Sequence, residues 1–231
     1  MTGKIGLISP VPFEAGLILK SLNPPKRKGF FKFGEIGSRK IAYSCSGIGM
    51  TNAAHAVTLM AEILKPDLII LFGIGGAYPG SGLAVGDIAL ADTEIYGDCG
   101  VIEEKGFRDM RAIGFPLLKK GRKEFFNEFP LKGNLLKKAE KILGVRSGRF
   151  VTVCAGTRSK KRAKELEKRW SGIVENMEGA AAAHIALLYD IPFLEIRGIS
   201  NIAGDPPGKW KKELAAEECQ EAVVKLISVL P

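Results

Sequence analysis

The chain has 231 residues, and 46% of them are apolar, which is enough for a substantial core and argues against a disordered protein. Its formal charge of +9 comes from dispersed Lys and Arg residues that are often mixed with Glu, so the charge indicates solubility and disfavours nucleic-acid binding. Because no segment approaches the roughly 20 apolar residues that cross a bilayer, and because the four cysteines form no CxxC pair, we expect a reduced cytoplasmic protein. It should have no membrane span, no secretory signal and no metal site.

Strands and helices are predicted to alternate in the first half of the chain. Residues 4–9 form a short apolar run that ends at Pro10, which predicts a strand. The segments FFKFGEIG and KIAYSCSGIG alternate well enough to be paired strands that meet at a corner of Gly37 and Ser38. The spacing of apolar residues predicts three further elements: a helix over 50–64 and strands over 67–76 and 86–96.

The second half begins with a long excursion over 97–130, where periodicity is weak; long loops of this kind are usually functional. The remaining predicted elements are helices over 135–143, 159–170, 180–188 and 214–229, and strands over 149–154 and 192–199. No linker or internal repeat interrupts this alternation. It predicts a single α/β domain over 1–231, with a mixed, mostly parallel central sheet flanked by helices.

Ligands of such sheets gather at the carboxyl ends of strands. This rule brings five segments to one rim, namely residues 10–14, 73–76, 155–157, 176–178 and 201–205. The glycine-rich segment 73–87 has neither a GxGxxG opening a helix nor a GK[ST], so dinucleotide and P-loop binding are not supported. Its glycines form a tight turn or let a flat ligand approach the backbone, and the sequence alone does not separate these two interpretations.

Two carboxylates are candidate functional groups. Glu178 lies at the start of a predicted buried helix, where the helix dipole favours an acid, but Met177 and four alanines crowd it. A buried carboxylate has two acceptor oxygens and suits a vicinal diol, and Met177 offers an apolar face to a sugar ring. Glu14 follows the first strand, and by itself it is better explained as an ordinary acid at a helix start.

Five segments occur in an order that resembles the purine nucleoside phosphorylase and nucleosidase superfamily: KIGLISPVPFEA, CSGIGMTNAA, FGIGGAYPGSGLAVGDI, VENMEGAAAAHIA and IPFLEIRGISN. The similarity spans nearly the whole chain, and within the superfamily it is greatest to the futalosine hydrolases. The resemblance implies a cofactor-independent, homo-oligomeric hydrolase of even subunit number that releases hypoxanthine from futalosine in menaquinone biosynthesis. The alternatives are a methylthioadenosine/S-adenosylhomocysteine or aminofutalosine nucleosidase, and a purine nucleoside phosphorylase.

The resemblance also implies roles for single residues. Glu14 matches the acid that activates water, Met177 and Glu178 match the ribose-binding pair, and Asn201 matches the residue that contacts the N7 side of the purine. The base pocket would comprise Gly75, Gly76, Thr157 and Asn176. A nucleoside-binding protein is disfavoured, because a binder needs no base such as Glu14 to activate water.

Three departures from the methylthioadenosine nucleosidases disfavour an adenine substrate. Asn201 stands where they have Asp, Asn176 stands where they have a further Glu, and VTVCAGTRS lacks their stacking aromatic residue. The amide of Asn201 carries a donor and an acceptor, so it can match the O6 and N7 edge of a 6-oxopurine. Asp205 is better explained as part of a GDPP turn than as a second group at the base.

Arginines distinguish the other possible reactions and ligands. None precedes Arg27 and none lies in 73–86, which favours hydrolysis over phosphorolysis. Futalosine carries an aryl carboxylate beyond its ribose, and Arg108 and Arg111 are candidates to bind it, because an arginine fork suits a carboxylate. Ordinary solvated charges explain these two residues slightly better. His55 and His184 are expected to be core or interface residues.

Overall fold

The computed structural model describes residues 3–22 and 25–230. Its strands are β1 (Lys4–Ser9), β2 (Lys26–Lys28), β3 (Phe31–Ile36), β4 (Arg39–Cys45), β5 (Leu68–Ala77), β6 (Ile88–Tyr96), β7 (Gly100–Glu103), β8 (Gly106–Asp109), β9 (Leu118–Lys120), β10 (Lys123–Phe125), β11 (Glu128–Pro130), β12 (Ser147–Thr152), β13 (Gly172–Asn176) and β14 (Phe193–Ile202). Its helices are α1 (Gly16–Ser21), α2 (Met50–Leu64), α3 (Asn134–Leu143), α4 (Lys160–Trp170), α5 (Gly179–Leu188) and α6 (Lys212–Val229), with short 3-10 helices η1 (Pro12–Ala15) and η2 (Pro207–Lys209).

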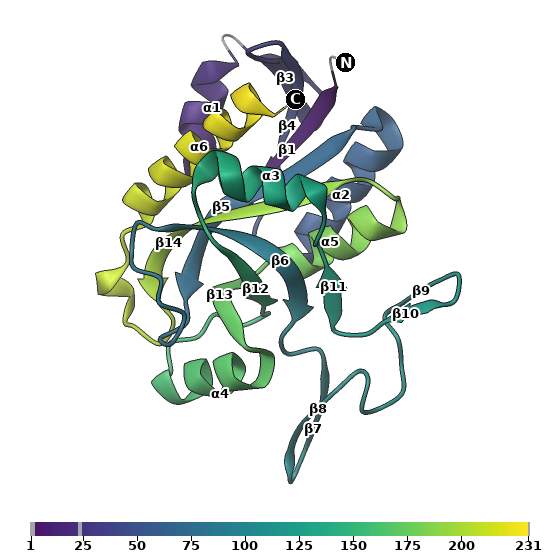
Figure 1. Ribbon diagram of the computed structural model, residues 1–231, viewed down its shortest axis with the longest axis vertical. Helices are drawn as coiled ribbons and strands as arrows, with labels where there is room; N and C mark the ends of the chain where they lie inside the picture. Colours follow the sequence, from purple (N-terminus) through teal and green to yellow (C-terminus); the bar gives the residue numbers. More distant parts are fainter. Residues whose placement is uncertain (1–2, 23–24, 231) are drawn as a thin grey trace.

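The two strands β5 and β14 lie at the centre of a mixed sheet. From β5 the sheet continues through β1, β4, β3 and β2 on one side, and through β13, β12, β6 and β11 on the other. Strand β14 pairs in parallel with β5 and antiparallel with β6, so β5, β13, β12, β6 and β14 close into a small barrel (Figure 1). The predicted α/β class and mixed sheet are therefore confirmed.

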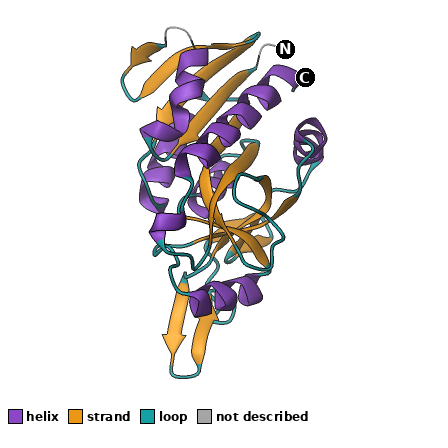
Figure 2. Cartoon of the chain, turned by 90° about the vertical axis from the view of Figure 1, so that its left-hand side faces the viewer, coloured by secondary structure: helices purple, strands orange, loops and turns teal. Residues whose placement is uncertain are grey.

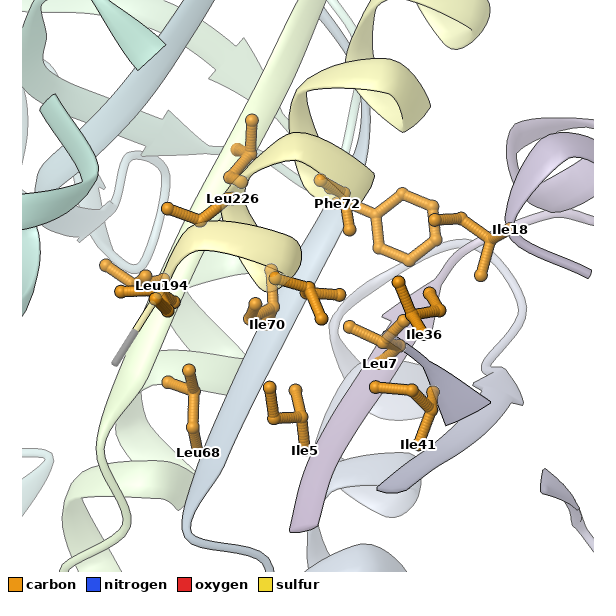
Figure 3. Close-up of a cluster of buried hydrophobic side chains, with 14 of the residues drawn as sticks. Ile5, Leu7, Ile18, Ile36, Ile41, Leu68, Ile70, Phe72, Leu194 and Leu226 are labelled. Carbon is orange, nitrogen blue, oxygen red and sulfur yellow. The ribbon is translucent and has the colours of Figure 1, made fainter. Parts of the chain in front are cut away.

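Helices cover both faces of the central strands, which explains why β5 is apolar at successive positions. Leu68, Ile70 and Phe72 face a core that includes residues of α1, α3 and α6 (Figure 3). Ile69 and Leu71 face a second core built with α2 and α5. Burying each of these side chains stabilises the fold by about 1.5 to 3 kcal/mol. The two layers hold β5 rigidly, so its carboxyl end is a firm support for a site.

The predicted excursion over 97–130 is not a loop. It contains the hairpins β7–β8 and β9–β10, followed by β11 on the edge of the main sheet. Figure 2 shows the β7–β8 hairpin projecting from the end of the molecule opposite the chain termini. These short strands are largely exposed and bury few side chains, so they leave little apolar alternation in the sequence. The analysis of periodicity also missed the short elements α1, β2 and β13: β2 is exposed, α1 is only six residues long, and β13 is buried but only five residues long.

Among the described residues, no helix is both long enough and apolar enough to span a membrane. The charged helix α4 exposes most of its Lys, Arg and Glu residues, as expected of a solvated face. His184 is stacked on Phe129 with ring centroids 4.5 Å apart, and burial lowers the pKa of its imidazole. His55 is exposed on α2, where its ring lies edge-on to Phe30. Neither histidine lines the cavity described next.

Candidate active site

A cavity of about 320 Å³ lies at the carboxyl ends of β1, β5 and β14, a size suited to a small ligand. All five segments predicted to share a rim contribute residues to the cavity, and the segment 201–205 contributes only Asn201. The residues that line it are Pro10, Val11, Phe13, Glu14, Ile48, Ile74, Gly75, Gly76, Gly156, Thr157, Glu175, Asn176, Met177, Glu178, Arg197, Ser200, Asn201, Trp210 and Lys212. The cavity thus brings together the predicted water-activating, ribose-binding and base-binding residues.

Glu14 is held in η1 directly after β1. Its Oε1 accepts a hydrogen bond from the Ile74 amide at 2.8 Å, and its Oε2 accepts one from the Val11 amide at 3.1 Å. Burial raises the pKa of this carboxyl from 4.5 to about 7, against the lowering effect of these amides and of Arg197. A carboxylate with a pKa near neutrality is well matched to accept a proton from water. The structure therefore gives Glu14 more than the properties of an ordinary helix-start acid.

Gly73 and Gly76 of β5 have a role other than forming a tight turn or letting a flat ligand approach the backbone. A β-carbon at position 73 would lie 2.8 Å from Oε1 of Glu14 and 3.1 Å from Nη1 of Arg197. A β-carbon at position 76 would lie 3.1 Å from Nδ2 of Asn201. The missing side chains at Gly73 and Gly76 therefore leave room for the polar side chains of the site itself.

Glu178 lies at the N-terminus of α5 with its side chain buried in the cavity wall. Its Oε1 accepts a hydrogen bond from the Gly49 amide at 2.9 Å, and its Oε2 accepts one from Nη2 of Arg197 at 3.1 Å. Each oxygen retains a lone pair for a further donor, as recognition of a diol requires. Met177 also lines the cavity, beside this carboxylate.

Arg197 is the main functional residue that the sequence analysis missed. Its side chain is only 1% exposed and bonds to Glu178, to Glu195 and to the carbonyl of Ile74. A buried arginine is expensive unless its charge is paired, and here two carboxylates pair it. The only signal in the sequence is an isolated charge inside the apolar strand FLEIRGISN, which stands out once that strand is known to be buried.

Asn201 reaches the cavity through a bulge in β14. Ile199 pairs with Gly75 and Asn201 pairs with Gly76, so Ser200 is an extra residue that re-aims the strand end. The Oδ1 of Asn201 accepts from the Ser200 hydroxyl at 2.8 Å, and its Nδ2 donates to the Ile202 carbonyl at 3.1 Å. The second N–H of this amide has no acceptor among the described residues. Asn201 can therefore offer a donor to a ligand.

Two predicted base-pocket residues have polar groups that are engaged within the protein. The amide and hydroxyl of Thr157 both donate to Glu175, at 2.8 and 2.6 Å. Asn176 accepts from the amides of Glu178 and Gly179 at 2.9 and 2.7 Å and so satisfies two backbone N–H groups at the start of α5. Both residues line the cavity with these groups already paired, so they shape it more than they offer free hydrogen bonds.

Trp210 and Lys212 complete the cavity from the segment that leads into α6, and the sequence analysis did not anticipate either residue. The indole N–H of Trp210 is buried and has no acceptor among the described residues. Asp205, by contrast, is not among the lining residues, and its amide donates to the Ile202 carbonyl in a turn.

The predicted tail-binding arginines lie in the β7–β8 hairpin and the turn that follows it. Arg108 donates to Glu103 at 3.3 Å and to the Ala112 carbonyl at 2.5 Å. The guanidinium of Arg111 lies over the ring of Phe126, 4.3 Å from its centroid. Neither residue lines the cavity of its own chain. Within residues 3–22 and 25–230, no group of three or more His, Cys, Asp or Glu side chains could hold a metal ion.

Comparison with known proteins identifies the family. A family model described as the phosphorylase superfamily matches residues 4–230. Futalosine hydrolase of Thermus thermophilus is 33% identical over 187 residues, covering 80% of this chain and 80% of the relative. The 5'-methylthioadenosine/S-adenosylhomocysteine nucleosidase of Listeria monocytogenes is 31% identical over 243 aligned positions, covering 98% of this chain and 99% of the relative.

Solved structures support the same fold. The methylthioadenosine/S-adenosylhomocysteine nucleosidase of S. pneumoniae with a transition-state inhibitor has a TM-score of 0.85 at 22% identity, covering 99% of this chain and 100% of that one. The native futalosine hydrolase of Helicobacter pylori has a TM-score of 0.83 at 19% identity, covering 100% and 99%. The chain therefore belongs to the phosphorylase superfamily, in the branch that contains the futalosine hydrolases and the methylthioadenosine/S-adenosylhomocysteine nucleosidases.

Proposed function

We propose that this N-glycosidic nucleoside hydrolase acts on futalosine and releases hypoxanthine, a reaction of menaquinone biosynthesis. The orientation of the Asn201 amide is the observation that carries the proposal. Its oxygen is engaged by Ser200, while an N–H remains available to a ligand. Hypoxanthine presents the acceptor O6 at the 6-position, which this N–H can match, whereas adenine has an amino donor there.

In the proposed reaction, the carboxylate of Glu14 accepts a proton from a water molecule whose oxygen bonds to C1′ of the ribose. The bond between C1′ and N9 of the purine breaks, and its electron pair goes to the base. The free N–H of Asn201 donates a hydrogen bond to O6, which shares this charge, and the released base then takes a proton from solvent. Glu178 accepts from the ribose hydroxyls, and its charge faces the oxocarbenium-like sugar of the transition state.

Hydrolysis is a better match to the site than phosphorolysis. Arg197 is the arginine among the cavity-lining residues, and each of its three nitrogens already donates to a protein oxygen. A phosphate nucleophile would compete with Glu178 and Glu195 for this guanidinium and would place a further anion beside three buried carboxylates. Neighbouring like charges repel strongly in a poorly solvated cavity. A neutral water molecule avoids this cost.

Arg108 and Arg111 remain our proposed partners for the aryl carboxylate of futalosine. Because neither residue lines the cavity of its own chain, in the conformation of this structure they can serve this role only from a second copy of the chain. The assignment is thereby linked to the predicted homo-oligomer of even subunit number. Lys212 supplies a cation within the same chain and is the competing assignment.

The test is to incubate the protein with futalosine, aminofutalosine, inosine and methylthioadenosine, each with and without phosphate, and to identify the released base and sugar. We expect hypoxanthine and a free sugar from futalosine in the absence of phosphate. Phosphate-dependent formation of a sugar 1-phosphate would refute hydrolysis. Faster release of adenine from methylthioadenosine would instead assign the methylthioadenosine nucleosidase activity, which the Listeria relative favours.

A further inference from the structure

Two acids that the proposed reaction does not use are buried directly behind the site. Glu94 in β6 and Glu195 in β14 are both completely inaccessible to solvent. A β-carbon at Gly179, the residue after the ribose-binding Glu178, would collide with Oε1 of Glu94 and with Oε2 of Glu195. Glycine at this position therefore lets two carboxyl groups meet under the first turn of α5.

A bulge in β6 brings the two acids together. Gly148 of β12 pairs with Ala91 and Arg149 pairs with Thr93, so the intervening residue of β6 is extra and the side chains after it change face. Glu94 consequently shares the face of Ala91. Arg197 of β14 lies opposite Ala89 of β6 and so shares the face of Ala89 and Ala91. Glu195, two residues before Arg197, points the same way.

The hydrogen bonds of the pair leave one oxygen without a donor. Glu94 accepts from Thr152 Oγ1 and Asn176 Nδ2, both at 2.7 Å, and from the Ile95 amide at 3.2 Å, and Glu195 Oε1 accepts from Arg197 Nε at 2.8 Å. The Oε2 of Glu195 has no partner among the described residues other than the carboxyl of Glu94. A buried carboxylate oxygen without a donor is costly, and so are two adjacent negative charges. One proton between the two acids removes both costs.

We propose that Glu94 and Glu195 share one proton, which resides on Glu94, and that the singly charged pair positions Arg197 between Glu195 and Glu178. Glu195 is the charged member because it is the one bonded to Arg197. Burial raises the pKa of Glu94 well above its usual range, and the charge of Glu195 raises it further. The two acids are thus positioning residues that act through Arg197. They hold the Arg197 guanidinium where it bonds to the ribose-binding Glu178 and where its positive charge acts on Glu14.

If the proton resides on Glu94, replacing Glu195 and replacing Glu94 should change the pKa of Glu14 differently. The titratable groups that face the pair are Arg197, Glu178 and Tyr96. Glu195→Gln removes a negative charge from behind Arg197, so the pKa of Glu14 should fall. Glu94→Gln replaces one neutral group by another and should leave that pKa unchanged, whatever its effect on rate.

Two of the titratable groups near Glu14 stay neutral where Glu14 titrates. The titratable groups that face Glu14 are Arg197, Glu178, Tyr43 and Cys219. Burial raises the pKa of Tyr43 and of Cys219 above their ordinary values, so both stay neutral in the acidic range. The acidic limb of kcat/KM against pH is assigned to Glu14, and its displacement between wild type and each variant is the measured quantity. We expect the limb to move about one pH unit lower in Glu195→Gln, as expected for one charge removed at close range in a protein interior.

This reading of the pH profile depends on the proposed role of Glu14, so a second measurement is independent of activity. Infrared spectra of Glu14→Gln at about pH 8, without substrate, should contain the carbonyl-stretch band of a neutral, buried carboxylic acid. The same band should be absent from the double variant Glu14→Gln/Glu94→Gln. If that double variant does not fold, Glu14→Gln alone still decides, because absence of the band overturns the shared proton.

The outcomes separate the two proposals. The assignment is supported if the acidic limb of kcat/KM moves in Glu195→Gln but not in Glu94→Gln, and if the infrared band of the neutral acid disappears when Glu94 is replaced. A shift in Glu94→Gln with none in Glu195→Gln places the proton on Glu195 and overturns it. If no nucleoside is cleaved, the proposed function fails, while the infrared result still tests the acid pair.

Discussion

Replacing Glu14 by Gln should reduce activity and at the same time change the pH dependence of stability. The pKa of Glu14 is raised from 4.5 to about 7 in the folded protein, mainly by burial. Between these values the folded state holds a proton that the unfolded state has lost, so the free energy of unfolding falls as pH rises through 7. The folded and unfolded pKa values differ by 7 − 4.5, or about 2.5, which corresponds to at most about 3.4 kcal/mol at 1.36 kcal/mol for each pKa unit.

Gln at position 14 does not titrate, so the contribution of this residue to the pH dependence of stability should vanish in the variant. Denaturant unfolding of wild type and Glu14→Gln at about pH 5 and about pH 8 gives two stability differences. The variant should gain up to about 3 kcal/mol relative to wild type between the two pH values. Comparing the same protein pair cancels other buried acids whose pKa is raised, such as Glu94 and Glu175. An equal stability difference at both pH values would refute the raised pKa of Glu14.

Activity supplies the other half of this prediction. Since the ionised form of Glu14 accepts the proton, wild-type kcat/KM should fall about tenfold per pH unit below about 7. Loss of a general base costs about 10² to 10⁴ in rate, so Glu14→Gln should lose that much in kcat while still binding nucleoside. Near-full activity of the variant would mean that another group activates the water.

Three further predictions follow from the site. Gly73→Ala places a β-carbon 2.8 Å from Glu14 Oε1 and should displace this base. We expect kcat, measured at saturating substrate, to fall by on the order of 100-fold. An unchanged kcat would show that Glu14 tolerates the displacement. Arg108→Ala and Arg111→Ala should each raise KM about ten- to over a hundredfold for futalosine but not for inosine, which lacks the carboxylate; equal effects on both substrates would place the tail elsewhere. Light scattering at micromolar concentration should find an even-numbered homo-oligomer, and a monomer would contradict that assignment.

The elements with a buried apolar core could be predicted from the sequence, because their periodicity records which face is covered. Strands β5 and β14 and helix α2 are of this kind, and their predicted positions agree with the structure. The hairpins β7–β8 and β9–β10 could not be found in this way, because exposed strands need no apolar alternation. Their existence depends on pairing between segments and on contacts that a single sequence does not display.

The site was predictable where a motif carries the residue and unpredictable where tertiary packing creates it. Glu14, Glu178 and Asn201 follow from the resemblance, and all three line the same cavity. Arg197 was hidden within an apolar strand, since only the fold reveals that two acids lie beside it. Trp210 comes from a segment without regular periodicity, and the bulges that re-aim Glu94 and Asn201 depend on the register between strands.

The most direct test of the central claim is the ratio of kcat/KM for futalosine to that for aminofutalosine, which differ at the 6-position of the purine. The account predicts that wild type prefers futalosine, because the free N–H of Asn201 meets an acceptor. It also predicts that Asn201→Asp lowers the ratio by about 5- to 150-fold, the effect of mispairing one buried hydrogen-bonding group. A wild-type preference for aminofutalosine, or a ratio unchanged in Asn201→Asp, would contradict the assignment of a 6-oxopurine nucleosidase.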